Sequence, residues 1–211
     1  MVHGYDVAMI EIFPLHGIPE VEPGDDLPGL LLTALESSPI SPSAGDVVVV
    51  THKIVSKAEG RIIDADDEPA YRAAVENEAK AIIRRRGDLV ITQTRHGFIC
   101  ANAGVDRSNV TGDRAVLLPI DPDRSAHGIR MRILQATGID IPVIISDTFG
   151  RPWRRGQTDI AIGVSGMAVM EDHKGRPDAN GRVMEATEIA IVDEIAAAAD
   201  LAMGKSTQVP V

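Results

Sequence analysis

The feature that most constrains the fold of this chain is a continuous β-branched run at Asp46–Thr51. A strand with one face in water alternates apolar and polar residues, whereas an unbroken apolar run is typical of a buried strand. A second apolar run covers Ile141–Ser146 and predicts another strand. Aromatic residues make up only 3% of the chain, so the core has to be built from Val, Ile, Leu, Ala and Met. We therefore expect mixed α/β packing with many β-branched strand residues.

The length and hydrophobic content of the chain predict one compact domain. With 211 residues and 44% hydrophobic residues, the chain can bury one sizeable core. We expect residues 1–211 to form a single domain, which could be divided into two lobes.

Charge and cysteine content exclude several classes of partner. A net charge of −10 argues against nucleic-acid binding, which needs an extended basic face. The single cysteine, Cys100, excludes an intramolecular disulfide and a cysteine-based zinc cage. We expect no leader peptide, because Met1–Asp6 carry neither a charged leader nor an apolar segment, and no window approaches the roughly 18 apolar residues of a membrane span. We expect a cytoplasmic protein without a membrane partner.

Local patterns predict the remaining elements. Further strands are expected at Val7–Phe13, Leu89–Thr92, Gly97–Ala101 and Thr158–Val164. Helices are expected from the cap at Asp25–Leu27 through Leu35, over Glu68–Arg85, from a cap at Asp123 to Gly138, and over most of Met184–Met203. The β-branched residues of Thr187–Val192 leave the start of the last helix ambiguous, and Lys174–Arg182 is rich in turn residues.

The segment Ile144–Gly156 combines a strand with residues suited to metal and phosphate binding. Its apolar run ends in Asp147 and Thr148, and Arg151, Arg154 and Arg155 follow. A carboxylate and a hydroxyl can bind a hard cation such as Mg²⁺, and guanidinium groups suit phosphate or carboxylate oxygens. A capped, solvated turn with its own ion pairs is the alternative, and these residues alone leave it open.

Polar side chains follow two further apolar runs, as they do at Asp147–Thr148. They are Thr51–His52 with Lys57, and Asp106 with Asn109. Ligands of α/β sheets gather at the carboxyl ends of strands, and such groups suit a metal-bound triphosphate. For each residue, an ordinary surface or turn role remains the alternative.

Familiar nucleotide and catalytic motifs do not fit this chain. Gly204-Lys205-Ser206 is similar to the end of a P-loop, but it closes a helix and lacks the leading glycine. Asp147-Thr148-Phe149-Gly150 lacks the other kinase loops, and Gly163–Gly166 lacks the spacing of a nucleophile elbow. The histidines show no spacing typical of a zinc site.

Long blocks of the sequence resemble, in order, the coenzyme F420-0:L-glutamate ligase family. The blocks span nearly the whole chain and are Gly17–Glu20, Pro23–Asp26, Thr51–Gly60, Asn102–Val110, Leu117–Asp123, Ile145–Arg151 and Val192–Leu201. The resemblance implies a mixed α+β fold with flanking helices, distinct from P-loop and ATP-grasp proteins, and a homodimer. It also implies a GTP-dependent ligase that joins L-glutamate to F420-0 and could add further γ-linked glutamates.

The resemblance also assigns roles to residues. Contacts to GTP would come from Ile18, Pro19, Glu20, Val21, His52, Lys57 and Asn109. Asp106 and Asp147 would be the catalytic residues and, with Thr148, would hold two divalent metal ions, Mg²⁺ or Mn²⁺. K⁺ is the expected activator. In relatives a small hydroxyl residue commonly stands at the position of His52, and the chain stops at Val211 where relatives continue, so we expect a C-terminal truncation.

The implied chemistry agrees with the residues. A carboxylate must first take a phosphoryl group, because only the resulting acyl phosphate is opened readily by an amine. Metal ions would neutralise the triphosphate, and one of the three arginines near Asp147 could hold an anionic substrate. A metal-dependent phosphohydrolase or phosphotransferase using Asp106 and Asp147 is one rival interpretation. A non-catalytic nucleotide-binding domain of a larger two-domain protein is the other.

Overall fold

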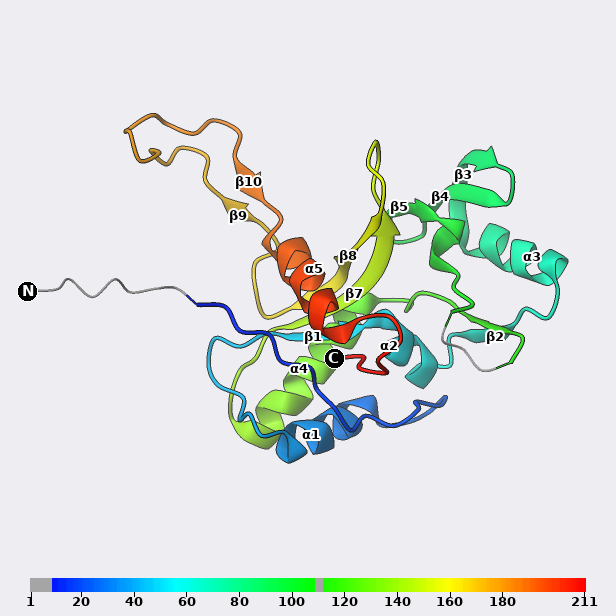
Figure 1. Ribbon diagram of the computed structural model, residues 1–211, viewed down its shortest axis with the longest axis horizontal. Helices are drawn as coiled ribbons and strands as arrows, with labels where there is room; N and C mark the ends of the chain where they lie inside the picture. Colours follow the sequence, from blue (N-terminus) through cyan, green and yellow to red (C-terminus); the bar gives the residue numbers. More distant parts are fainter. Residues whose placement is uncertain (1–8, 109–111) are drawn as a thin grey trace, which may run out of the picture.

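A computed structural model describes residues 9–108 and 112–211 of the chain. Its central sheet has the strand order β1-β7-β8, with β1 at Val48–Thr51, β7 at Val143–Gly150 and β8 at Gln157–Ser165. Strand β1 pairs with β7 in parallel, and β7 pairs with β8 in antiparallel orientation. The two continuous apolar runs are thus neighbouring strands, as expected for buried strands of one sheet (Figure 1).

Helices cover the central sheet on both faces. Helix α4 (Pro122–Thr137) packs on β7 and β8, and α1 (Leu27–Ser37) packs against α4. Helix α5 (Ile191–Met203) covers the other face (Figure 1). Side chains of consecutive β7 residues point to opposite faces of the sheet. Val143 and Ile145 belong to the core under α1 and α4, whereas Ile144 packs with α5. This sandwich explains why β7 is continuously apolar.

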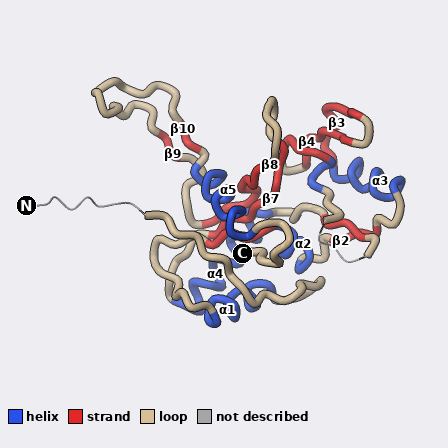
Figure 2. The backbone as a smooth tube through the Cα atoms, in the orientation of Figure 1, coloured by secondary structure: helices blue, strands red, loops and turns tan. Residues whose placement is uncertain are grey.

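A second group of elements has its own hydrophobic core. It contains the antiparallel sheet β3-β4-β5, the strand pair β2-β6 and helix α3, and lies beside the central sheet (Figure 2). The bounds are β2 Ile62–Asp64, α3 Glu68–Glu78, β3 Ala79–Arg86, β4 Leu89–Thr94, β5 Ile99–Ala101, the 3₁₀ turn η1 Asn102–Gly104 and β6 Arg114–Val116. Helix α2 (His52–Ala58) links the groups, because it follows β1 and contacts β6.

Two hairpins project from the body of the molecule. One carries the short strands β9 (Glu171–Asp172) and β10 (Glu188–Ile189) and holds the turn-rich segment around residues 174–182, as predicted (Figure 1). The other is the tip of β7 and β8, where residues 151–156 connect the two strands.

Most predicted elements are confirmed, and the fold is of the α+β class. Strands β4, β5 and β8 and helices α1 and α4 lie where the patterns placed them. Gly138 ends α4 in a left-handed conformation, as expected, although the N-cap is Asp121 instead of Asp123. In the described residues, no helix is long and apolar enough to cross a membrane.

Two predicted elements are wrong in extent or type, and the ambiguous start of a third is resolved. The helix expected over Glu68–Arg85 ends at Glu78. Residues 79–86 form strand β3 instead, because the two-residue turn Gly87–Asp88 lets them pair with β4 as an antiparallel hairpin. The strand expected at Val7–Phe13 is absent from its described part, residues 9–13, which are irregular. The last helix begins at Ile191, within the stretch that the sequence left ambiguous, and Glu188–Ile189 of that stretch form β10.

Strand β7 is longer than its apolar run. It continues to Gly150 because its pairing with β8 extends to Gln157. Asp147 and Thr148 therefore lie within the strand and not in a loop after it.

Candidate functional site

A cavity of about 800 Å³ lies where β1 and β7 end beside the C-terminal segment. Its walls are residues 18–21, the end of β1 with the start of α2, Asp147 and Thr148 of β7, Asp159 of β8, and residues 203–210 together with Asp200. The C-terminal segment is fixed there by backbone bonds, because Thr51 N donates to the carbonyl of Pro210 and Leu15 N to that of Val211. Five distant parts of the chain thus meet at one cavity.

Parallel pairing of β1 with β7 places His52 beside Asp147. Thr51 is the register partner of Ser146, so the next residue of each strand lies at the same sheet edge. His52 Nε2 is 3.2 Å from Asp147 Oδ1, and the imidazole is fully buried. No hydrogen bond of acceptable geometry joins the two atoms, so the contact is a close polar approach. Two of the three polar segments that follow apolar runs in the sequence therefore lie side by side here.

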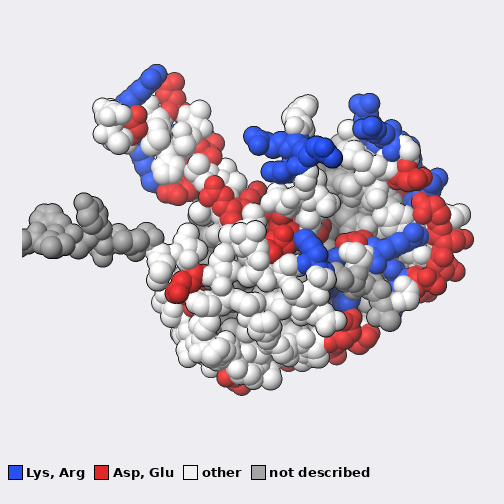
Figure 3. Space-filling model, viewed as in Figure 1, with Lys and Arg blue, Asp and Glu red and all other residues white. Residues whose placement is uncertain are grey.

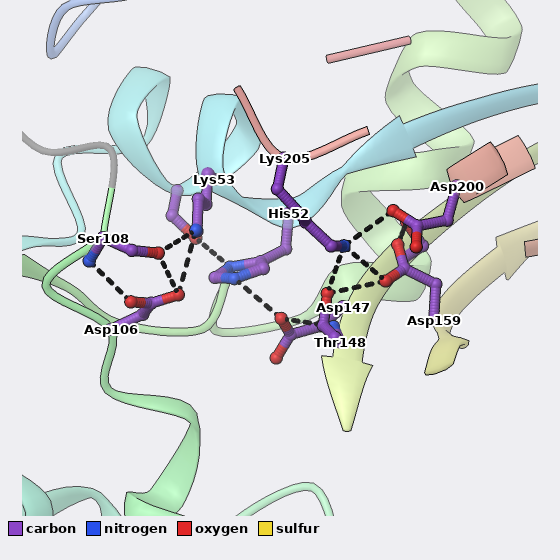
Figure 4. Close-up of polar contacts among 11 residues, drawn as sticks. His52, Lys53, Asp106, Ser108, Asp147, Thr148, Asp159, Asp200 and Lys205 are labelled. Carbon is purple, nitrogen blue, oxygen red and sulfur yellow. Dashed lines mark hydrogen bonds and ion pairs between the residues drawn. The ribbon is translucent and has the colours of Figure 1, made fainter. Parts of the chain in front are cut away.

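Asp106 joins this arrangement through Lys53. Lys53 Nζ lies 2.9 Å from Asp106 Oδ2 and donates to Ser108 Oγ at 2.6 Å (Figure 4). Ser108 also donates its backbone N–H to Asp106 Oδ1 at 2.6 Å. Burial alone would raise the pKa of Asp106, but the bonds from Ser108 and Lys53 outweigh it, so the pKa is lowered. Asp106 is therefore held as a carboxylate.

A second polar group lies on the α5 side of β7 and β8. Thr148 Oγ1 donates to Asp159 Oδ1 at 2.6 Å, and Lys205 Nζ lies within 3.1 Å of Thr148 Oγ1, Asp159 Oδ1 and Asp200 Oδ1 (Figure 4). Asp159 is only 4% exposed. Burial alone would lower the pKa of Lys205, yet the bond to Asp200 and the charge of Asp159 raise it. The ammonium group of Lys205 thus sits among three oxygens as a permanent cation.

A lysine of α2 and a glutamate of residues 18–21 form an ion pair at the cavity wall. Lys57 Nζ on α2 contacts Glu20 Oε1, and both residues line the cavity. Lys57 is buried, which ties residues 18–21 to α2.

The sequence matches a family model described as F420-0:Gamma-glutamyl ligase over residues 17–211. The chain belongs to this family. Three relatives carry the name Coenzyme F420:L-glutamate ligase. That of Methanothermobacter thermautotrophicus is 41% identical, with 94% of this chain and 85% of the relative aligned. That of Archaeoglobus fulgidus is 41% identical, with 93% and 83% aligned. That of Methanopyrus kandleri is 39% identical, with 97% and 85% aligned.

For this member of the F420-0:gamma-glutamyl ligase family, the structure gathers most of the site residues predicted from the sequence. Those that line the cavity are Ile18, Pro19, Glu20, Val21, Lys57, Asp147 and Thr148. His52 is fully buried and Asp106 is bound to Lys53, and neither belongs to the lining. Asn109 lies outside the described residues. The roles of these residues in binding stay predictions.

Sequence reasoning missed Asp159, Asp200 and Lys205. Asp159 had a readable signal, since a carboxylate interrupts the apolar strand that ends at Val164. In the sequence Lys205 stands out only as part of a P-loop pattern that does not fit, although in the fold it lines the cavity. Asp200 lies on a helix, and no local pattern distinguishes it from a surface carboxylate.

The oxygen atoms around the cavity fit a hard divalent cation. Asp147, Asp159, Asp200 and Thr148 all contribute oxygens to the cavity lining, and those of Asp159, Asp200 and Thr148 are already bonded to Lys205, which leaves Asp147 as the carboxylate open to a metal ion. Within residues 9–108 and 112–211, no three His, Cys, Asp or Glu side chains form a ready cluster for a metal ion. Mg²⁺ usually binds to one or two carboxylates and completes its shell with waters and substrate phosphates. The donors are therefore suited to a metal that arrives with a nucleotide.

Proposed function

We propose that this chain is a GTP-dependent ligase that joins the amine of L-glutamate to the carboxylate of F420-0 through an acyl phosphate. The observation that carries the proposal is the cavity, whose lining brings lysines and carboxylates together beside the end of β1 and Asp147–Thr148 of β7. Membership of the F420-0:gamma-glutamyl ligase family supplies the substrates. The same reaction could be repeated to add further γ-linked glutamates.

Lysine side chains would receive the triphosphate. Lys53, Lys57 and Lys205 all line the cavity, so their ammonium groups can lie against phosphate oxygens. Residues 18–21, which include Glu20, would contact the nucleotide along their part of the cavity wall. Asn109 is predicted to contact the nucleotide as well. Lys205 forms ion pairs with Asp159 and Asp200 and offsets one of their two negative charges, which reduces the repulsion of the nucleotide by these carboxylates.

Asp147 and Thr148 would hold a divalent metal, with Asp106 as the ligand of a second one. Bound Mg²⁺ or Mn²⁺ would neutralise charge on the triphosphate and act as a Lewis acid, and K⁺ is the proposed activator. His52 would act as a positioning residue, because its buried ring lies against Asp147 Oδ1 and restricts that carboxylate. The backbone N–H of Thr148 also donates to Asp147 Oδ1, at 2.7 Å, which leaves Oδ2 to face a ligand.

The reaction would proceed in two balanced steps. A carboxylate oxygen of F420-0 forms a bond to the γ-phosphorus while the bond to the β-phosphate oxygen breaks, giving an acyl phosphate and GDP. The amine of glutamate then bonds to the acyl carbon as the C–O bond to phosphate breaks, and the amine proton leaves with the phosphate. No protein nucleophile is needed, because the chain has only to orient the reactants and exclude water.

Mass spectrometry of the products tests the proposal. The chain is incubated with F420-0, GTP, glutamate, K⁺ and either Mg²⁺ or Mn²⁺, with parallel reactions that omit one component or replace GTP by ATP. We expect glutamylated F420 only in the complete GTP reaction. Rapid GTP hydrolysis without F420-0 and glutamate would indicate a phosphohydrolase instead. GTP binding without any product would indicate a nucleotide-binding module.

A further inference from the structure

The tip of the β7–β8 hairpin carries a combination of side chains that the proposed chemistry leaves without a role. Residues 151–156 are all exposed, and Trp153 is fully exposed at 102%. Three arginines, Arg151, Arg154 and Arg155, surround this tryptophan in the sequence. A single exposed apolar residue is common, but an exposed indole beside three guanidinium groups forms a surface for aromatic anions.

The charge of this tip is unusual for the molecule. The chain has a net charge of −10, yet residues 151–156 contain three arginines and no acidic residue. Among the ion pairs of the described residues, none involves Arg151, Arg154 or Arg155. The space-filling view shows the hairpin tip as a basic group above the body of the molecule (Figure 3). Its positive charge is therefore available to a ligand.

The local backbone holds the tip in shape. Arg151 Nη2 donates to the carbonyl of Arg155 at 2.7 Å, which closes the loop across its base. Trp153 has a φ of +55°, a left-handed conformation that costs free energy for a bulky residue. The indole of Trp153 points outward and is not folded back onto the protein, as its full exposure shows.

The tip is connected directly to the cavity. Gly150 pairs with Gln157 at the base of the loop. Thr148 pairs with Asp159 two residues further from the loop, toward the body of the molecule. Since a strand rises about 3.3 Å per residue, the base of the loop lies roughly 7 Å from the cavity wall. An elongated ligand could contact the tip at one end and reach Asp147 and Thr148 with the other.

We propose that this Trp-Arg tip, residues 151–156, binds the fused-ring and phosphodiester part of the acceptor substrate. The inference rests on the proposed function, in which the acceptor is F420-0, a deazaflavin that carries a phospholactyl group. The flat ring system stacks on Trp153, and Arg154 and Arg155 neutralise the phosphodiester. The lactyl carboxylate then extends along the hairpin to the cavity, where the phosphoryl group is transferred.

Intrinsic fluorescence gives a direct measurement of binding. Trp153 is the only tryptophan of the chain, so its emission reports the tip alone. Titration of F420-0 into the full chain, without GTP or glutamate, is expected to quench this emission and to saturate. Titration of GTP is expected to leave it unchanged. An unchanged emission with F420-0, or equal quenching by GTP, would overturn the proposal.

Kinetics of variants test the same subsite. Trp153→Ala and the double variant Arg154→Gln/Arg155→Gln are each expected to raise the KM for F420-0 about tenfold, as expected for loss of a stacking or ionic contact. The KM values for GTP and glutamate should stay within about twofold of the original. Trp153→Phe keeps an aromatic ring and should restore most of the affinity. A raised KM for GTP, with an unchanged one for F420-0, would show that the arginines serve the nucleotide.

A matched control uses the other projecting hairpin. Arg176→Gln/Arg182→Gln removes the same charge from exposed positions between β9 and β10, and it should leave the KM for F420-0 unchanged. Light scattering of each variant must give the mass of the original protein, since loss of an oligomer would instead identify the tip as a subunit contact. If F420-0 quenches Trp153 but no glutamylated product forms, the subsite stands and the proposed ligase activity fails.

Discussion

Asp147 is the residue on which the proposed chemistry most depends. Its carboxylate lines the cavity, its Oδ1 accepts from the backbone N–H of Thr148, and the buried His52 ring lies 3.2 Å from the same oxygen. Replacement by asparagine keeps the shape of the side chain but removes the charge that a divalent cation needs.

We predict that Asp147→Asn lowers kcat for glutamylation by at least about 100-fold while the melting temperature changes little. The measurement is single-turnover product formation followed by mass spectrometry, with thermal unfolding in parallel. Asp140→Asn makes the same chemical change on the exposed partner of Arg130 and should retain activity. Unchanged turnover in Asp147→Asn would contradict the assignment of Asp147 to metal binding.

Asp106 gives a prediction for the dependence of stability on pH. Its folded-state pKa lies below the ordinary value of 3.8, because bonds from Ser108 and Lys53 outweigh the effect of burial. The unfolded chain therefore binds a proton at higher pH than the folded chain does, so stability falls as the pH drops below about 3.8. Urea unfolding between pH 6 and pH 2 should show a smaller loss of unfolding free energy in Asp106→Asn than in the original protein. Equal slopes would show that this carboxylate is not stabilised by folding.

The sequence pointed to candidate acidic and hydroxyl residues but not to the contacts among them. Asp106, Asp147 and Thr148 were selected because each follows or ends an apolar run. The pairing of Asp106 with Lys53, and of Thr148 with Asp159 and Lys205, depends on segments that are distant in sequence. Such contacts follow from the sheet register and from the path of the C-terminal segment, and local patterns contain neither.

At the scale of elements, the packing of β8 against α4 is limited by one glycine. A Cβ atom on Gly163 would lie 2.5 Å from the backbone carbonyl of Pro122, at the start of α4. Backbone atoms cannot move aside as a side-chain end can, so any larger residue has to push the helix from the sheet.

We predict that Gly163→Ala lowers the unfolding free energy by about 1–3 kcal/mol. Gly128→Ala is the matched control, because Gly128 lies within α4 and an added Cβ would meet no atom within 4 Å. That change should stabilise the helix by roughly 0.5–1 kcal/mol. Denaturant melts of both variants, followed by circular dichroism, give the two values. A neutral Gly163→Ala would show that α4 does not lie this close to β8.

Elements with a strong local signal were predicted correctly, and the errors occur where tertiary pairing decides. The caps at Asp26 and Gly138 and the apolar runs of β1 and β7 are local signals. Residues 79–86 have helical spacing, yet the turn at Gly87–Asp88 and pairing with β4 make them a strand. The apolar residues before Pro14 have strand composition, but in their described part no neighbouring strand pairs with them.

At the scale of the whole molecule, the single cysteine reports on global unfolding. Cys100 is buried in the main core beside β7, and burial, with a smaller effect of Asp147, raises the pKa of its thiol to about 11. Few thiolates exist at neutral pH in the folded state, and the thiolate is the reactive form.

We predict that a thiol reagent at pH 8 labels folded Cys100 at least about 100-fold more slowly than it labels the chain in urea. Adding GTP with Mg²⁺ should slow the labelling further, because a ligand that binds only the folded state lowers the unfolded population. Rapid labelling without denaturant would mean that the core around β5 opens locally. Light scattering of the same sample would test the homodimer that the family resemblance predicts.

The parallel pairing of β1 with β7 also links activity to the order of folding. His52 and Asp147 become neighbours only after two strands far apart in the sequence have found each other, and Thr51 N is then paired with the carbonyl of Pro210 at the other end of the chain. Contacts between distant segments form slowly because long loops have to close first. The cavity should therefore be among the last features to appear during refolding, and nucleotide would bind to chains that have completed their central sheet.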